Sequence, residues 1–355
     1  MTPYSRLGYI RSLLKTEGIN GLILSAEPNV SYAAGFRAPD TYGFVTARGI
    51  ALVTDFRYAA DFKRFARSPV SVRQYERSLF ETMARLIVKD KLKKVGFEAR
   101  HLSFAECEIL NQRVGKKITL VPLQKTLEPL REIKDADEVS CIRRALSIAK
   151  KTLAFAKTRI KPGRSEAHIA ADMERFVRLN GACSMAFETI VASGPNSSYP
   201  HARLTDRIMK EGDPVVVDMG VDLNGYKCDL TRTFFLGKIN PVVLRAAEVV
   251  RQAQALAIRH IRPGITIRSL DAAARNYITQ QGFGKNFGHA LGHGIGLEVH
   301  ESPSINKTNS RKLEPGMVFT VEPGIYVPGR FGIRMEEMVL VTQRGVEVLS
   351  GNDRD

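Results

Sequence analysis

Acidic and histidine side chains recur at a regular spacing in the second half of the 355-residue chain. Asp218 follows the apolar run Val215–Val217, and Asp229 comes eleven residues later. Glu322 ends a similar apolar run, and Glu336 comes fourteen residues later. An acid that directly follows a strand is held by a rigid element, which suits a side chain that must be positioned for chemistry. These four acids are therefore candidate functional residues.

Four of the seven histidines lie in glycine-rich segments close to these acids: His201, His289, His293 and His300. Taken singly, these acids and histidines have ordinary explanations, such as a turn cap at Asp218, an ion pair between Glu336 and Arg334, or a core imidazole at His289. Taken together they do not, because buried carboxylates repel one another unless cations neutralise them. Histidine and carboxylate ligands suit Mn, Fe, Co or Zn. The pattern therefore predicts a metal site.

An internal repeat is expected to position these residues. The segment Ile160–Gly163 is echoed by Ile261–Gly264, and Pro162 and Pro263 are 101 residues apart. Each copy continues into a helical stretch and then into a strand, GDPVVVD or GMVFTVE, whose acid comes six residues after a glycine. Residues 160–240 and 261–345 are thus predicted to be two copies of one α+β unit, and a repeat of this kind can build a site between its halves.

A separate domain is expected before the repeat. Residues up to about 125 alternate between helical and strand patterns, with an amphipathic stretch at Tyr4–Glu17 and apolar runs at Gly21–Ser25 and Gly49–Thr54. The pair Asp135 and Glu138 is typical of a helix start. We predict a small α/β domain over residues 1–128 and a second domain over residues 129–355.

Composition limits the function classes. The chain has 53 Lys and Arg against 37 Asp and Glu, a net charge of +16, and residues 1–130 hold 21 basic and 12 acidic residues. The densest basic run, Lys89–Lys94, lacks the interleaved aromatics of single-strand binders, so a solvated basic face is favoured over nucleic-acid binding. Four scattered cysteines without a Cys-x-x-Cys pair favour a cytoplasmic protein. No apolar run is long enough to predict a membrane segment.

The sequence resembles the pita-bread metallopeptidases, specifically the branch of aminopeptidase P and prolidase (Xaa-Pro dipeptidase). In the first domain the resemblance rests on the segments 29–36 (NVSYAAGF), 54–58 (TDFRY) and 95–98 (VGFE), followed by 131–135 (REIKD). In the second domain it rests on residues 287–301 (FGHALGHGIGLEVHE) and on the repeated acids. It implies an α/β N-terminal domain and an α+β pita-bread catalytic domain with an internal pseudo-twofold repeat.

The resemblance also implies roles for individual residues. Five positions match the metal ligands of the family: Asp218, Asp229, His293, Glu322 and Glu336. Two divalent ions are expected, Mn first with Co or Zn as alternatives, bridged by Asp229 and Glu336. His201, His289 and His300 are expected to bind the substrate and the developing oxyanion. Glu322 is expected to carry a proton to the leaving nitrogen. Arg334 is expected to be a catalytic residue and Tyr326 a substrate-binding residue, and both are expected to orient the metal ligands.

Several functions remain open within this resemblance. Methionine aminopeptidases share the five ligands, but His289 and the N-terminal domain favour the proline-specific branch. The intact ligand set argues against a creatinase, which does without the metal. It also argues against a non-catalytic binding protein that uses the basic N-terminal domain. Prolidases restricted to dipeptides need a cation for the C-terminal carboxylate of the substrate, and some archaeal-type members carry an arginine directly after the segment that corresponds to His300–Pro303, where this chain has Ser304. Arg330, Arg334 or the N-terminal domain of a partner subunit is the alternative source of that charge. We therefore expect an Xaa-Pro aminopeptidase that acts on peptides with proline at the second position, with prolidase as the alternative. A homodimer is also expected.

Overall fold

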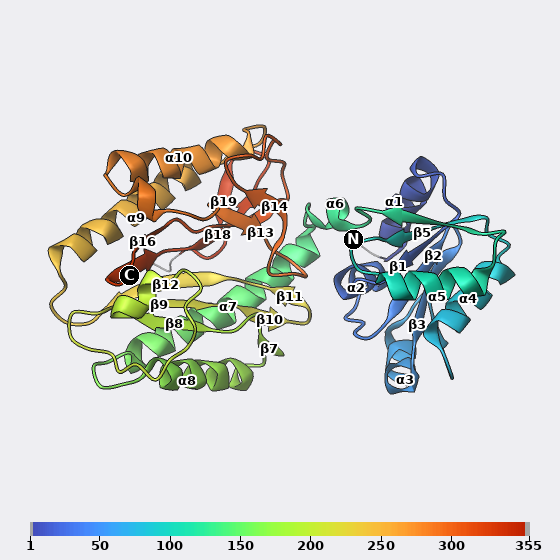
Figure 1. The fold of residues 1–355 in the computed structure, drawn as a ribbon, viewed down its shortest axis with the longest axis horizontal. Coiled ribbons are helices and arrows are strands. Elements are labelled where there is room, and N and C mark those ends of the chain that lie inside the picture. Colours follow the sequence, from blue (N-terminus) through green and yellow to red (C-terminus); the bar gives the residue numbers. More distant parts are fainter. Residues whose placement is uncertain (1–2, 352–355) are drawn as a thin grey trace. The chain divides into compact units, whose positions relative to one another are not determined.

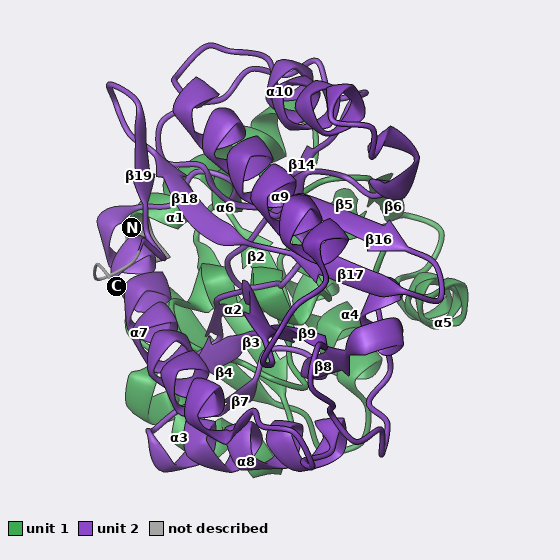
Figure 2. Cartoon of the chain, turned by 90° about the vertical axis from the view of Figure 1, so that its left-hand side faces the viewer, with its two compact units in different colours: residues 1–131 green, residues 132–355 purple. Residues whose placement is uncertain are grey.

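The computed structural model describes residues 3–351, which belong to two compact units (Figures 1 and 2). Unit 1 is Met1–Arg131 and unit 2 is Glu132–Asp355. Helix α6 (Glu128–Arg131) ends unit 1, so the division between the units falls three residues beyond the domain boundary predicted from the sequence.

Unit 1 is built on one mixed six-stranded sheet in the order β4-β3-β2-β1-β5-β6. The antiparallel pairs are β1–β2 and β2–β3, whereas β3–β4, β1–β5 and β5–β6 are parallel. Parallel neighbours need a crossover connection, and helices supply it. The strands are β1 (Gly21–Leu24), β2 (Tyr42–Thr46), β3 (Gly49–Thr54), β4 (Val70–Gln74), β5 (Lys94–Glu98) and β6 (Thr119–Leu123).

Five longer helices accompany this sheet: α1 (Pro3–Thr16), α2 (Glu27–Ala34), α3 (Phe56–Phe65), α4 (Leu79–Lys89) and α5 (Phe104–Val114). Side-chain caps define several of their starts. Asp55 accepts a hydrogen bond from the backbone of Arg57 at the start of α3, and Ser103 forms a capping box with Glu106 at α5. Apolar residues of α4 and α5, including Ile87 and Leu110, are fully buried with those of the strands. The predicted α/β architecture is therefore present.

The first half of unit 2 contains two long helices and two three-stranded antiparallel sheets. Its elements are α7 (Ala136–Arg159), α8 (Glu166–Leu179), β7 (Ser184–Met185), β8 (Ile190–Ser193), η1 (Gly194–Ser198), β9 (Pro214–Met219), β10 (Val221–Leu223), β11 (Tyr226–Lys227) and β12 (Leu230–Phe235). The orders of the two sheets are β11-β10-β7 and β12-β9-β8, so β9 lies between β12 and β8. Asp135 caps α7 in the predicted capping box with Glu138.

The second half follows the same plan of a helix pair and then strands. Its elements are α9 (Pro241–His260), α10 (Ile267–Gln280), η2 (Gly284–Asn286), β13 (Gly292–Gly294), β14 (Glu301–Ile305), β15 (Val318–Val321), β16 (Gly324–Val327), β17 (Phe331–Arg334), β18 (Glu337–Val341) and β19 (Val346–Val348). The main sheet has the order β14-β13-β15-β18-β19, and β16 pairs with β17. In Figure 1 the strands of unit 2 lie between the pair α7–α8 and the pair α9–α10.

Equivalent backbone contacts show that the two halves are structural copies. Gly163 donates its N–H to the carbonyl of Met209 at 3.0 Å, and Gly264, 101 residues later, donates to Leu313 at 2.8 Å. Both glycines have a positive φ, 88° and 86°, which a side chain would strain. The buried side chains form two clusters: one contains Ile169 and Val217 of the first half together with Val318 of the second, and the other contains Leu270 and Phe319 of the second half. Two cores therefore support the strands that carry the predicted site.

Across residues 3–351, every helix is too short or too polar to span a bilayer.

Candidate metal centre

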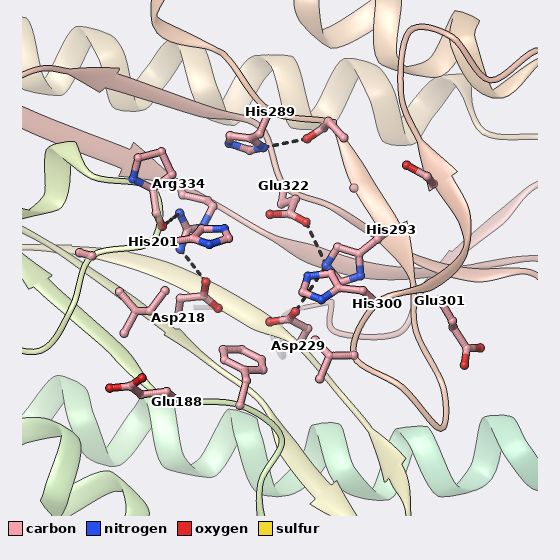
Figure 3. Close-up of a pocket in the computed structure, with 18 of the residues that line it drawn as sticks. Glu188, His201, Asp218, Asp229, His289, His293, His300, Glu301, Glu322 and Arg334 are labelled. Atoms are coloured by element: carbon pink, nitrogen blue, oxygen red, sulfur yellow. Dashed lines mark hydrogen bonds and ion pairs between the residues drawn. The ribbon is translucent and has the colours of Figure 1, made fainter. Parts of the chain in front are cut away.

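One cavity of about 710 Å³ in unit 2 brings together most of the predicted site residues (Figure 3). The predicted residues that line it are His201, Asp218, Asp229, His289, His293, His300, Glu322 and Arg334. Glu336 and Tyr326 are 1% and 7% exposed and lie behind this lining, in contact with residues that form it. A cavity of this volume is typical of a small-molecule or peptide site.

The acids reach the cavity from matching positions in the two halves of unit 2. Asp218 lies on β9, where it pairs with Thr231 of β12, and Asp229 directly precedes β12. In the second half, Glu322 directly follows β15 and Glu336 directly precedes β18. In each half, therefore, one acid lies at the end of a strand and a second acid lies at the start of a neighbouring strand.

Three side chains from both halves converge most closely. Ligand atoms of Asp229, His293 and Glu336 all lie within 4.8 Å of one another. His293 Nε2 lies 3.6 Å from Asp229 Oδ2 and 3.2 Å from Glu322 Oε1. This spacing leaves room for a cation between the groups, and oxygen with imidazole nitrogen is a donor set that Mn, Fe, Co or Zn accepts.

Buried oxygens without hydrogen-bond partners support a cation at this position. Asp218 Oδ1, Asp229 Oδ1 and Glu336 Oε1 are buried atoms for which the described residues offer no hydrogen bond. An unpaired buried carboxylate oxygen is costly, so native structures rarely leave one unsatisfied. Three such atoms from three predicted ligands fit a metal site.

The electrostatics also favour a cation. Burial raises the pKa of Asp229 well above its ordinary value, and the negative charges of Glu336 and Asp218 raise it further. The pKa of Glu336 is raised for the same reasons, by burial and by the charges of Glu322 and Asp218. Without a cation these carboxyl groups hold protons more tightly than usual, so a divalent ion would replace those protons.

Glu322 and His293 form a charge-assisted pair at the edge of the cluster. Burial opposes ionisation of Glu322, but the hydrogen bond and charge of His293 outweigh it and lower the pKa of Glu322. Burial likewise opposes protonation of His293, but Glu322 raises its pKa overall. Thr320 donates its hydroxyl to Glu322 Oε1 at 3.0 Å, which fixes the carboxylate. Glu322 is therefore an ionised group held in place next to the cluster.

Arg334 links Asp218 to the substrate side of the cavity. Its Nη2 lies 2.5 Å from Asp218 Oδ2, and its Nη1 donates to the Tyr326 hydroxyl at 2.8 Å. That hydroxyl lies 3.2 Å from His289 Nε2. The alternative that Glu336 forms an ion pair with Arg334 is therefore wrong, because the guanidinium of Arg334 binds Asp218 instead.

The histidines at the cavity differ in their surroundings. Burial lowers the pKa of His289, so its imidazole is neutral near pH 7. Burial and the neighbouring His293 lower the pKa of His300, whose ring centroid lies 4.2 Å from that of His293. A neutral imidazole donates from one nitrogen and accepts at the other, which suits contacts with a peptide carbonyl or amide.

Close backbone packing explains the glycines beside His293. A Cβ on Gly292 would lie 1.9 Å from the carbonyl oxygen of Thr320, and one on Gly294 would lie 2.2 Å from that of Ser302. Both distances are shorter than any side chain allows. The two glycines let strand β13 fit between its neighbours β14 and β15 and hold His293 at the cavity.

Sequence reasoning missed several residues of the cavity. Arg203, Glu188 and Phe187 line it, but no motif marked them. Arg203 is two residues after His201, so its proximity to a predicted site residue was the available signal. Thr231 was also missed, although its hydroxyl donates to Glu336 Oε2 at 2.8 Å.

Comparisons with known proteins identify the family of the chain. Residues 140–343 match metallopeptidase family M24, and residues 6–133 match the creatinase/prolidase N-terminal domain. The chain is 35% identical over 350 residues to the uncharacterized peptidase YqhT of Bacillus subtilis (strain 168), with 99% of each chain covered.

Two solved structures share the whole fold. The Xaa-Pro dipeptidase from Bacillus anthracis has a TM-score of 0.95 at 32% identity, with 100% of this chain and 99% of that chain covered. The X-Pro aminopeptidase from Thermotoga maritima MSB8 has a TM-score of 0.91 at 32% identity, with 99% of each chain covered. These matches confirm the predicted two-part fold and its pita-bread catalytic domain. The chain therefore belongs to metallopeptidase family M24 and is a metal-dependent peptidase with a creatinase/prolidase N-terminal domain.

Proposed function

We propose that this peptidase hydrolyses the Xaa-Pro bond at the N-terminus of peptides, with two divalent ions, of which Mn is the first candidate. The observation that carries the proposal is the cluster of Asp229, His293 and Glu336, whose ligand atoms lie within 4.8 Å of one another, together with the buried, unpaired carboxylate oxygens of Asp229 and Glu336. Relatives over nearly the whole chain include several Xaa-Pro dipeptidases or prolidases and an X-Pro aminopeptidase. Members of both activities thus share this fold.

The proposed ligands are Asp218, Asp229, His293, Glu322 and Glu336. When bound, the ions would supply Lewis-acid polarisation of the scissile carbonyl and an activated water. The residues themselves hold the donor atoms in place: Arg334 fixes Asp218, Thr231 fixes Glu336 and Thr320 fixes Glu322. Because these three donors are fixed before substrate arrives, this part of the site needs little reorganisation during reaction.

The remaining residues are assigned by their position around the cluster. Glu322, an ionised carboxylate beside His293, is proposed to carry a proton to the leaving nitrogen. His201, His289 and His300 line the same cavity and are proposed to bind the peptide carbonyls. Tyr326 and Arg334 act through their hydrogen bonds, which orient His289 and Asp218 respectively.

Proline makes a dedicated enzyme necessary. The nitrogen of an Xaa-Pro bond carries no hydrogen, and the ring fixes φ, so a cleft that requires an N–H donor rejects it. After cleavage the nitrogen must gain a proton to leave as an amine. A fixed acid–base group such as Glu322 meets this need.

Two substrate lengths are candidates. We propose that peptides longer than two residues are accepted, because Ser304, which lines the cavity after Pro303, supplies no cation to restrict substrates to dipeptides. The dipeptidase activity is the second candidate, and the relatives named as Xaa-Pro dipeptidases or prolidases favour it.

Mass spectrometry of the products from the peptides Ala-Pro, Ala-Pro-Ala-Ala and Met-Ala-Ala, with Mn²⁺ and with chelator, tests the proposal. Metal-dependent release of alanine from the tetrapeptide shows the aminopeptidase activity, and cleavage of Ala-Pro alone shows a dipeptidase. Cleavage of Met-Ala-Ala alone would move the protein to the methionine-specific branch. Intact peptides in the presence of bound metal would overturn the proposal.

Two further proposals concern the protein as a whole, its location and its oligomeric state. Cys107, Cys141, Cys183 and Cys228 are all free thiols, which supports a cytoplasmic location. We propose a homodimer, to be tested by light scattering. No nucleic-acid role is proposed for the basic charge of unit 1, and a shift assay at low salt would reveal one.

A further inference from the structure

Residues 287–291 bring His289 to the cavity without belonging to a helix or a strand. Helix η2 ends at Asn286 and strand β13 begins at Gly292, so the residues between them are irregular backbone. Irregular backbone lacks the hydrogen bonds of a helix or a sheet, so its polar groups need partners elsewhere. His289 lines the cavity from this segment (Figure 3). The contacts that fix residues 287–291 therefore also fix the position of the imidazole.

Arg275, on helix α10, supplies two of these partners. Its Nη1 donates to the carbonyl oxygen of Phe287 at 3.0 Å, and its Nη2 donates to that of His289 at 2.8 Å. The central carbon of the guanidinium also lies 4.3 Å from the centroid of the Phe287 ring, a cation–π contact. One side chain thus binds two carbonyl groups and an aromatic ring of the segment.

Asp271 holds the guanidinium of Arg275 in turn. It lies one turn earlier on α10, is fully buried, and accepts hydrogen bonds from Nε at 2.7 Å and from Nη2 at 2.8 Å. Such a bidentate pair fixes the orientation of the planar guanidinium. Asp271 Oδ1 also accepts the backbone N–H of Leu291 at 3.2 Å. The pair of Asp271 and Arg275 therefore binds the segment at both of its ends, Phe287 and Leu291.

The imidazole of His289 rests against this fixed backbone. The rings of Phe287 and His289 meet edge to face, with centroids 5.0 Å apart and planes at 90°. Nδ1 of His289 lies 2.7 Å from the carbonyl oxygen of Ala290, and Nε2 lies 3.2 Å from the Tyr326 hydroxyl. Two of these three contacts come from the segment itself. The position of the ring therefore follows the position of the backbone.

We propose that Asp271 and Arg275 position His289 for the reaction by fixing residues 287–291. The inference rests on the proposed function, in which His289 binds a peptide carbonyl. Of these described residues, His289 and Ala290 line the cavity, and Asp271 and Arg275 do not. A binding group that is already held in place loses less conformational freedom when the substrate arrives. Asp271 and Arg275 are thus positioning residues that act on turnover through His289.

An ordinary ion pair within a helix does not account for this arrangement. Arg251 and Glu248 on α9 form such a pair, with side chains 56% and 54% exposed, and pairs of this kind stabilise a helix only slightly. Asp271 is instead fully buried, and Arg275 reaches two carbonyl groups outside its helix. Lysine would keep the charge but lacks the planar fork that binds a carboxylate and two carbonyls together. Arg275→Lys therefore separates the ion pair from the hold on the segment.

A double-mutant cycle on the Mn²⁺-loaded protein tests the proposal, with the Xaa-Pro peptide that the wild type cleaves fastest. Arg275→Lys should lower kcat roughly 10-fold at unchanged metal content, and Asp271→Asn is the second variant should Arg275→Lys not fold. In the His289→Ala background the same substitution should change kcat by less than about twofold, because the group through which it acts is gone. The matched control Arg251→Lys should leave kcat unchanged. Equal losses in both backgrounds, or no loss in either, would overturn the proposal.

The histidine signals in NMR spectra give a second readout that needs no turnover. In the Zn²⁺-loaded protein, the ring signal of His289, identified by its loss in His289→Ala, should shift or broaden in Arg275→Lys. The signals of His168 on α8 and His260 on α9 should not move. If the protein cleaves no Xaa-Pro peptide yet the His289 signal changes, the proposed function fails and the positioning role stands. If it cleaves the peptides and the signal stays as in the wild type, only the role of Arg275 fails.

Discussion

Lys134 and Glu301 form an ion pair inside unit 2, with Nζ and Oε1 2.7 Å apart and side chains only 1% and 7% exposed. Lys134 lies just before helix α7, and Glu301 lies at the cavity next to His300. A residue near the start of the unit is thus tied to the histidine segment 167 positions later.

Breaking this pair should destabilise unit 2. Lys134→Met leaves the charge of Glu301 buried without its cation, so the free energy of unfolding should fall by about 3–5 kcal/mol. Arg143→Met is the matched control, because its pair with Glu347 is 44% and 42% exposed and should contribute at most about 1 kcal/mol. Urea unfolding measures both. The double variant Lys134→Met, Glu301→Gln should recover much of the loss, and additive losses would show that the two residues are not coupled.

Removing either central acid should abolish metal loading. Asp229→Asn and Glu336→Gln each remove a carboxylate from the cluster with His293, and activity should fall by several orders of magnitude. Metal content by mass spectrometry and turnover of Ala-Pro measure the effect. Glu188→Gln, which lines the same cavity outside the cluster, should retain full metal content. Turnover at the wild-type rate by Asp229→Asn with matched metal would contradict the assignment.

His289→Ala should separate chemistry from metal binding. His289 contacts Tyr326 and not the central cluster, so the variant should bind metal normally while kcat falls roughly 10- to 100-fold. The control is His260→Ala, at the end of helix α9 and away from the cavity. A parallel loss of metal and activity in His289→Ala would show a structural role.

The stability of the metal-free protein should fall as the pH rises. Folded-state pKa values of Asp229, Glu336 and His293 are raised, so the folded state holds protons that the unfolded state has released. Stability is then present at low pH and is lost as the pH rises through the folded pKa values, by up to about 1.4 kcal/mol per pH unit for each group.

Bound metal should reverse this trend, because the ligands must be deprotonated to bind it. Thermal unfolding between pH 5 and 8, with chelator and with Mn²⁺, measures the effect. The gap in Tm should widen with increasing pH. A gap that stays constant across this range would show that these groups do not exchange protons for metal.

Local signals were sufficient to predict much of this molecule. The capping pair Asp135 and Glu138 and the apolar strands before Asp218 and Glu322 are properties of short segments, and the structure contains each. The repeat was visible because equivalent glycines need the same positive φ. Such features depend on few neighbours, so sequence alone reveals them.

Contacts between distant segments could not be predicted in this way. Arg334 is close to Glu336 in sequence, yet its guanidinium binds Asp218, 116 positions away. Arg203 and Arg207 look alike in the sequence, and only the position of Asp213 shows that one is paired. Partner choice among charged residues depends on the assembled fold, which no local pattern encodes.

The duplicated architecture has a consequence for how the site comes into existence. Asp218 and Asp229 belong to one copy, whereas His293, Glu322 and Glu336 belong to the other, so neither copy holds the whole cluster. The first hydrophobic cluster also includes Ile295, Val318 and Met338 of the second copy, so the two copies share part of their core. If unit 2 were divided between β12 and α9, neither fragment alone would therefore bind metal or show activity. The two fragments would bind metal only after they associate, so the metal content would measure the docking of the two halves.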